Sequence, residues 1–492
     1  MLERLPDLSG YMKICQDIIF PQIIDTDFEG LYKEGGRPPV SPRVLMCVTI
    51  LQFLEKIPDR AAARNIVYRL DWKIALGLEV NDPGFSYQLL SVWRTRIVEN
   101  DSAKRVFDDL VELLKEKGLV KKNGKQRIDS THVLADLREL SRVELMTETL
   151  RLACLDLLKL KVILPDSIAK IINTYHEGIN LYQLGSTERS RILGQAGIDM
   201  LNLVEFSKVG LLDGEDSKNI QTVITVFEQN FTVDEKSVVP KLIKVPTGKD
   251  HICSPHDTEA RFGSKHKKIG YKAQIVETAE RDQGNFIIDV IEEDNEQTDH
   301  GKLEEALERL VEKNLAPGTV YADAGYISGK TINKTEEEDI NVLGPIENRS
   351  REFSDDFQYD QYEDQYTCPE GKTSNSVLEE SDGSKIYRFS ASDCSSCPLK
   401  AQCRPKAKEG SRDGRIVRRS KYHNEISERR ELMKTETYKE AMKNRNAIEG
   451  TISALKRGAG LARCKFKGKA NFRTQLFFSA IAFNIKRLDA WV

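Results

Sequence analysis

The chain has 492 residues, of which 39% are hydrophobic and 31% charged, and its formal net charge is −3. This composition excludes a disordered chain, and no stretch approaches the ~20 consecutive apolar residues that a membrane span requires. The length predicts two to four domains, or large insertions, instead of one compact core. The first residues, MLERLPDLSG, do not resemble a signal peptide, so we expect a cytoplasmic protein without membrane association.

Basic residues are concentrated towards the C-terminus. Residues 401–492 contain 23 Lys and Arg against 9 Asp and Glu, a net of +14, which leaves −17 for the remainder of the chain. A basic segment on an otherwise acidic chain indicates a nucleic-acid partner. A solvated, lysine-rich surface would give the same count and is the alternative.

The first 120 residues have the pattern of several short helices. Apolar residues recur at helical spacing over 41–58 and in later segments that are separated by tight turns. Arg94 and Arg96 project from one of the later predicted helices, and short helices of this kind are typical of helix-turn-helix proteins. We therefore expect an all-α DNA-binding domain over 1–120, with a plain helical bundle as the alternative.

Three carboxylates occupy positions that a folded α/β domain could bring together. Asp129 lies within a predicted strand in QRIDSTHVLA, Asp323 ends another in TVYADAGY, and Glu449 lies on a predicted helix in NRNAIEGTISALKR. Carboxylate oxygens suit Mg²⁺ or Mn²⁺, and two such ions roughly 4 Å apart stabilise both oxygens of a phosphoryl transfer. The three acids therefore predict a metal site for DNA strand cleavage and transfer.

Two long segments interrupt the strands and helices around these acids. The first, over about 139–247, is helical, and the second, over about 349–430, changes from acidic to cysteine-bearing to basic. With both interpreted as insertions, the order of elements over 121–492 predicts a mixed α/β sheet. Asp299 is predicted to cap a helix of this domain.

The helix that carries Glu449 also carries two cations. At about 100° per residue, Arg445, Glu449 and Lys456 lie within about 40° of one another, so we expect the cations to hold DNA phosphates beside a bound metal. The alternative is an exposed ion pair worth a few tenths of a kcal/mol. Four further basic residues are predicted to contact the DNA backbone: Lys465, Lys467, Lys469 and Arg473.

Four of the nine cysteines cluster: Cys368, Cys394, Cys397 and Cys403. A Cys-x2-Cys pair with one thiol close behind and another upstream can hold a tetrahedral zinc ion, which would fold an insertion that has few apolar residues. Reduced thiols without a metal and an iron–sulfur cluster are the alternatives. In a cytoplasmic chain the cysteine count argues against a disulfide framework.

Together these motifs resemble the DDE transposases of bacterial insertion sequences, whose catalytic core is ribonuclease H-like. IDSTHV is similar to the family's D-[GS]-T strand and YADAGY to its D-x-G-Y motif. The third acid resembles the Y-x-x-R-x-x-x-E-x-x-x-x-x-x-K helix, with Met442 in place of the tyrosine. The resemblance implies an α/β, ribonuclease H-like fold with Asp129, Asp323 and Glu449 as the metal-binding, catalytic residues.

The resemblance also implies a reaction and its partners. The protein would bind the terminal inverted repeats of its own element, nick them with metal-activated water and join the freed 3′-hydroxyl to target DNA. We expect it to assemble as a homodimer on DNA, at the bacterial nucleoid. A metal-dependent nuclease of the same fold that does not join strands is one alternative. A non-catalytic, zinc-containing DNA-binding regulator is the other.

Overall fold

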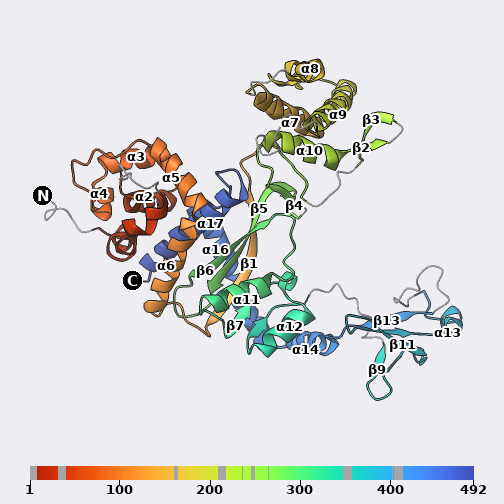
Figure 1. Cartoon of the computed structure of the whole chain (residues 1–492). Coiled ribbons are helices and arrows are strands. Elements are labelled where there is room, and N and C mark those ends of the chain that lie inside the picture. Colours follow the sequence, from red (N-terminus) through yellow and green to blue (C-terminus); the bar gives the residue numbers. More distant parts are fainter. Residues whose placement is uncertain are drawn as a thin grey trace.

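This computed structural model describes residues 8–31, 40–159, 164–208, 218–234, 237–244, 250–263, 265–346, 357–401, 403 and 414–491. A central sheet with packed helices forms the body of the molecule, and two smaller parts project from it (Figure 1). No helix in the described part of the chain is both long and apolar enough to cross a membrane.

Among the described residues, the central sheet contains six strands: β1 (Lys125–Leu134), β4 (Arg261–Gly263), β5 (Lys268–Thr278), β6 (Ile287–Asp294), β7 (Thr319–Tyr321) and β8 (Asn341–Leu343). β5 pairs antiparallel with one side of β1, and β7 pairs parallel with its other side. β4 and β6 extend the sheet antiparallel beyond β5, and β8 extends it parallel beyond β7. The predicted class, a ribonuclease H-like mixed α/β sheet, is confirmed.

Strand β5 is buried from Gly270 to Thr278 because the sheet continues on both of its edges and helices pack on it. Such a strand must place even its polar side chains inside the protein. Lys272, Gln274 and Glu277 are all buried, and a buried polar group is costly unless it has a partner. Their partners lie at the candidate active site and beside it.

Helix α17 (Lys469–Asp489) joins the sheet to the N-terminal helices. It contacts β6 and β5 as well as α1, α2, α5 and α6, and one apolar core contains residues from all of them. The N-terminal elements are α1 (Tyr11–Ile14), η2 (Cys15–Ile19), η3 (Phe20–Gln22), η4 (Asp25–Leu31), α2 (Pro42–Glu55), α3 (Asp59–Tyr68), α4 (Leu70–Leu76), α5 (Gln88–Glu99) and α6 (Ser102–Glu116). The described residues of 1–120 therefore share their core with the sheet, and their role as a separate DNA-binding domain stays a prediction.

The first projecting part follows β1 and has an apolar core of its own (Figure 1). Its elements are α7 (Arg142–Leu157), α8 (Asp166–Tyr175), α9 (Ser186–Lys208), α10 (Lys218–Asn230), β2 (Phe231–Asp234) and β3 (Ser237–Leu242). The segment is helical except for the antiparallel hairpin of β2 and β3. Its chain leaves the sheet after β1 and returns to it at β4, and the bounds of the insertion, about 139–247, stay a prediction.

The second projecting part contains the cysteine cluster. Its elements are β9 (Gln358–Asp360), β10 (Gln365–Thr367), β11 (Ser376–Glu379), β12 (Lys385–Arg388), α13 (Ala391–Ser395) and β13 (Ile416–Arg419). A small cluster of buried aromatic residues and one valine forms its core. Residues 349–356, 402 and 404–413 of the predicted insertion lie outside the described residues.

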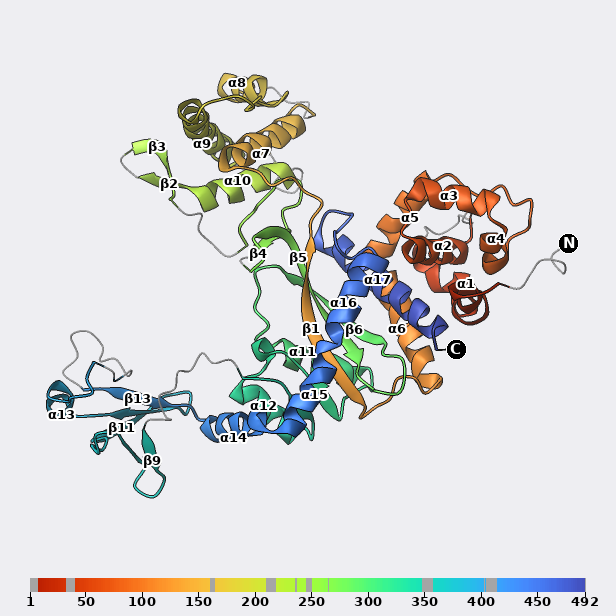
Figure 2. The ribbon, with the colours of Figure 1, turned by 180° about the vertical axis from the view of Figure 1, so that it is seen from behind.

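The remaining helices border the sheet. They are α11 (Lys302–Glu312), α12 (Gly329–Glu337), α14 (His423–Lys434), α15 (Glu436–Asn446) and α16 (Ile448–Gly458). Figure 2 shows α15 and α16 lying end to end beside β1. These two helices bring the third predicted acid to the sheet.

Candidate active site

The first two predicted acids come from neighbouring segments of the sheet: Asp129 lies in the middle of β1, and Asp323 follows the end of β7 by two residues. β1 and β7 pair in parallel, with Lys125 opposite Thr319 and Arg127 opposite Tyr321. Continuing this register by two residues brings Asp129 beside Asp323. Ligand sites of α/β sheets commonly occur at this carboxyl end of parallel strands. Parallel pairing with one register therefore explains how residues 194 positions apart come together.

Arg445, at the end of α15, contacts all three predicted acids. Its Nη2 lies 3.3 Å from Oδ2 of Asp129 and 3.5 Å from Oδ2 of Asp323, and its Nη1 lies 3.9 Å from Oε1 of Glu449 in the first turn of α16. The Arg445 and Asp129 side chains are 14% and 16% exposed, whereas that of Glu449 is 70% exposed. A guanidinium cation therefore stands between the three carboxylates.

This arrangement fits a divalent cation in its chemistry. The ligand set is three carboxylates, and the guanidinium supplies the positive charge that a metal ion would supply. Its Nε is buried without a partner among the described residues. As the structure describes them, no three or more His, Cys, Asp or Glu side chains lie close enough together to hold a metal ion. Binding an ion would therefore require Arg445 to withdraw and the carboxylates to close in.

The electrostatics of Asp129 also favour an added cation. Burial raises the pKa of this carboxyl above its ordinary value, and the negative charges of Asp323 and Asp299 raise it further. The backbone amide of Ser130, 2.8 Å away, and the charge of Arg445 act in the opposite direction. The ionised form of Asp129 is thus stabilised only in part, and a cation would complete its stabilisation.

The acids open onto a cleft with a volume of about 590 Å³. Lys456 of α16 lines the same cleft, and burial lowers the pKa of its ammonium group. Arg445, Glu449 and Lys456 thus face one cavity, but the helix that carries them is not continuous as predicted. α15 ends at Asn446 and α16 begins at Ile448.

Asp299 is a fourth carboxylate in this cleft that the sequence did not indicate. Its Oδ1 lies 2.6 Å from Nζ of Lys272 and accepts a hydrogen bond from Nε2 of Gln274 at 3.1 Å, and its Oδ2 accepts one from Oγ of Ser130 at 3.4 Å. Burial would raise its pKa, but the hydrogen bonds from Lys272 and Gln274 lower it overall. The expected capping role is wrong, because Gly301 is the N-cap residue of α11.

Two family models match parts of the chain, and neither match includes Asp129, Asp299 or Asp323. One, described as a transposase DDE domain, matches residues 367–489, and another, described as a transposase domain, matches residues 12–96. The first contains Arg445, Glu449 and Lys456. The chain is a DDE transposase of the insertion-sequence type. No curated protein and no solved structure matches it.

As a member of this family, the transposase is a metal-dependent polynucleotidyl transferase that acts on DNA. Its exposed basic residues are therefore candidate contacts to DNA. Lys465 and Lys467 are exposed in the loop between α16 and α17. The loop is fixed to the sheet, because the amide of Cys464 donates to the carbonyl of Leu134 at 2.6 Å. These two lysines are therefore presented on a fixed loop near the end of β1.

Other basic residues of the transposase that the sequence predicted to contact DNA have acidic partners. Arg94 lies 2.6 Å from Asp59, and its guanidinium lies 4.4 Å from the centre of the Phe466 ring. Residue Arg96 lies on the same helix, α5. The cation–π contact places this helix beside the loop of Lys465 and Lys467, so one surface combines the N-terminal helices with the C-terminal loop.

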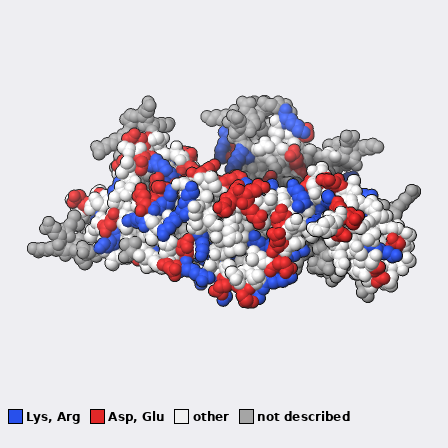
Figure 3. All heavy atoms as spheres, turned by 90° about the horizontal axis from the view of Figure 1, so that it is seen from below, with Lys and Arg blue, Asp and Glu red and all other residues white. Residues whose placement is uncertain are grey.

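Two more predicted DNA contacts lie near the start of α17. Lys469 Nζ lies 3.1 Å from Asp294 Oδ1, and Arg473 lies 2.6 Å from Asp101. These cations are partly neutralised within the protein. On the face shown in Figure 3, Lys and Arg side chains are likewise interspersed with Asp and Glu. At these two positions the predicted positive charge is therefore offset by acidic neighbours.

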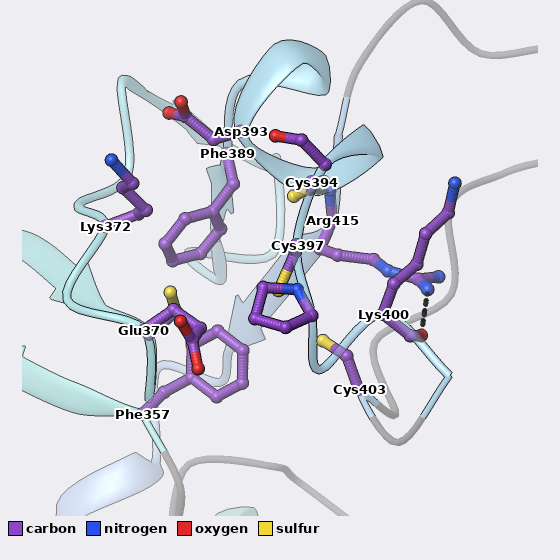
Figure 4. A pocket seen from close by; sticks show the side chains of 13 residues that line it. Phe357, Glu370, Lys372, Phe389, Asp393, Cys394, Cys397, Lys400, Cys403 and Arg415 are labelled. Atoms are coloured by element: carbon purple, nitrogen blue, oxygen red, sulfur yellow. Dashed lines mark hydrogen bonds between the residues drawn. The ribbon is translucent and has the colours of Figure 1, made fainter.

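The four clustered cysteines of the transposase line one small pocket (Figure 4). The amide of Arg415 donates to Sγ of Cys394 at 3.4 Å. Burial raises the pKa of the Cys403 thiol; the charge of Arg415 opposes this shift, and the other three thiols add to it. In the described arrangement the thiols do not form a metal-holding group. The structure thus brings the predicted zinc ligands to one place without closing them around an ion.

Proposed function

We propose that the transposase binds the terminal inverted repeats of its own element, cleaves DNA there and joins the freed 3′-hydroxyl to target DNA. Asp129, Asp323 and Glu449 would hold the divalent ions, Mg²⁺ or Mn²⁺. The observation that carries this proposal is the convergence of the three carboxylates on one guanidinium in an open cleft. Bound ions would supply the charge that stabilises attacking and leaving oxygens.

The protein's own residues would bind and orient the DNA. With the carboxylates neutralised by a bound cation, their attraction for the Arg445 guanidinium would be weaker. Arg445 would then be able to pair with a phosphate of the DNA. Its planar guanidinium suits two parallel hydrogen bonds to phosphate oxygens. Lys456, which lines the same cleft, would contact the same DNA strand as a point charge.

The N-terminal helices and the C-terminal loop would divide the work of DNA binding. Arg94 and Arg96 on α5 belong to the helices proposed to recognise the terminal repeats. Lys465 and Lys467 would contact phosphates without regard to sequence, because an ammonium group acts as a point charge and lacks the rigid fork with which arginine reads base edges. The expected homodimer on DNA would bring two such surfaces to the two ends of the element.

A strand-joining assay tests this function against a nuclease of the same fold. The substrates are a terminal-repeat duplex that already carries a free 3′-hydroxyl end and a supercoiled target plasmid, with Mg²⁺. Joined products are expected, and they should disappear when the end carries a 3′-dideoxy nucleotide. Cleavage of uncut repeats without joining of pre-cut ends would support the nuclease. The match to a DDE domain already favours an enzyme over a non-catalytic regulator.

We also propose that the pocket of Cys368, Cys394, Cys397 and Cys403 takes a structural zinc ion by drawing its thiols together. The support is that four thiols line one pocket in a part with a very small apolar core. Protein purified without chelators should contain about one zinc per chain. Cys397→Ser should lose it and Cys253→Ser should keep it. Absence of metal from the wild-type protein would exclude the proposal.

A further inference from the structure

A buried ion pair lies beside the candidate active site, on the same face of β1. Arg127 precedes Asp129 by two residues in β1, and its Nε lies 2.6 Å from Oε1 of Glu277 in β5. The two side chains are 5% and 0% exposed. Neither is among the residues that line the cleft in the described part of the structure. The pair therefore holds β1 and β5 together without facing substrate.

The same pair also holds the helices that carry the third acid. Nη1 of Arg127 donates to the carbonyl of Asn444 at 2.8 Å, and Oε2 of Glu277 accepts from Oγ1 of Thr451 at 2.8 Å. Asn444 immediately precedes Arg445, and Thr451 follows Glu449 by two residues. One buried ion pair is thus hydrogen-bonded to the chain just before Arg445 and just after Glu449.

The Arg127 contact lies next to the interruption between Arg445 and Glu449. α15 ends at Asn446 and α16 begins at Ile448, and the carbonyl of Asn444 accepts from Arg127 just before this break. A side chain from the strand of Asp129 is therefore bound close to the point where the two helices meet.

We propose that Arg127, Glu277 and Thr451 are positioning residues that fix Glu449 and Arg445 relative to Asp129. This inference rests on the proposed function, because it assumes that these carboxylates hold the metal. The clamp is stiff because a buried ion pair that loses one of its hydrogen-bond partners leaves an uncompensated polar group. The clamp keeps the distance between β1, which carries Asp129, and the α15–α16 helices, which carry Arg445 and Glu449, constant before DNA binds.

Thr451→Val is the most discriminating variant, because it keeps the side-chain shape and removes only the hydroxyl that binds Glu277. The Mg²⁺ concentration for half-maximal cleavage of terminal DNA should rise by roughly tenfold, the usual effect of losing a contact behind a metal ligand. Mn²⁺ binding to the DNA-free protein, followed by electron paramagnetic resonance, should weaken by a similar factor. The Kd for terminal DNA without metal should not change. Thr451→Ser, which retains the hydroxyl, should restore the wild-type metal requirement.

Thr335→Val is the matched control. Thr335 is also fully buried, and its hydroxyl donates to the carbonyl of Thr331 at 2.9 Å within α12. This variant should lose similar stability and keep the wild-type metal requirement. An equal rise in metal requirement in both variants, or no rise in Thr451→Val, would overturn the clamp.

A third variant separates this inference from the function on which it rests. Asp129→Asn should abolish cleavage. If it does so while Thr451→Val behaves like the wild type, the carboxylate site stands and the clamp fails. If Asp129→Asn still cleaves at the wild-type rate, the proposed site itself fails, and the inference fails with it.

Discussion

The two predicted metal sites of this transposase are built in different ways. The acid site draws on two strands and a helix of the main sheet, and Arg445 already provides a positive charge between its carboxylates. The cysteine pocket belongs to a projecting part with a core of only five buried apolar residues among those described, although Arg415 lines it beside the thiols. The acid site should therefore hold its shape without metal, whereas the cysteine pocket should depend on one.

The largest effect is expected at the acid site. Asp129→Asn keeps the side-chain shape but removes the charge that a divalent ion needs, so cleavage in Mg²⁺ should fall by roughly 10³-fold or more, about 4 kcal/mol of lost transition-state stabilisation. Gel-based cleavage of terminal-repeat DNA measures this. Asp360→Asn, an acid of the projecting cysteine-bearing part, is the control and should cleave normally. Asp129→Asn should still bind the DNA.

Removing metal should next distinguish the two sites by their structure. Chelation by EDTA, or the Cys397→Ser change, should unfold the cysteine-bearing part locally and expose it to limited proteolysis. The sheet and the acid site should stay resistant, because their core is apolar and large. Cleavage sites mapped by mass spectrometry give the answer. Equal resistance of both parts after chelation would show that the cysteine pocket does not need a metal.

A smaller effect concerns Arg445 as the internal counter-charge. Arg445→Gln should lower the free energy of unfolding of the metal-free protein by about 1–2 kcal/mol, because three carboxylates lose a partly buried cation. Added Mg²⁺ should stabilise this variant more than the wild type, since no guanidinium has to be displaced. Thermal denaturation with and without Mg²⁺ measures both. Lys443→Gln on the exposed side of α15 should change neither quantity.

The smallest effect is expected at the basic loop. Lys465 and Lys467 are exposed, whereas Lys469 pairs with Asp294. Changing the first two to Ala should make the plot of log K against log salt shallower by up to about 0.9 for each lost phosphate contact. Terminal and random DNA should be weakened by similar factors. Lys469→Ala alone should change the slope less than Lys465→Ala alone or Lys467→Ala alone.

The comparison also shows what sequence could and could not reveal. Asp129 and Asp323 were predictable because one lies within a run of strand-forming residues and the other ends such a run, and the parallel register then sets them side by side. The interruption at Ala447 was not predictable, since no proline or glycine marks it, and neither was the contact of Asn444 with a side chain more than 300 positions earlier. The largely buried α17 likewise joins regions that the sequence suggested were separate.

Charged residues inside strands were the most misleading signal. Arg127 and Glu277 would normally be expected on a solvated face, and their pairing depends on the register of β1 against β5. Asp299 was assigned to a helix cap because an acid near a helix start usually caps it. Only the folded arrangement shows that Lys272 and Gln274 direct it to the cleft instead.

Mapping the bound metal tests the central claim most directly. Fe²⁺ in place of Mg²⁺, with ascorbate and peroxide, generates radicals that cut the polypeptide next to the ion. We predict cuts close to Asp129, Asp323 and Glu449, suppressed by excess Mg²⁺ and lost in Asp129→Asn. Cuts confined to other parts of the chain, unchanged in Asp129→Asn, would show that these three carboxylates do not form the metal site.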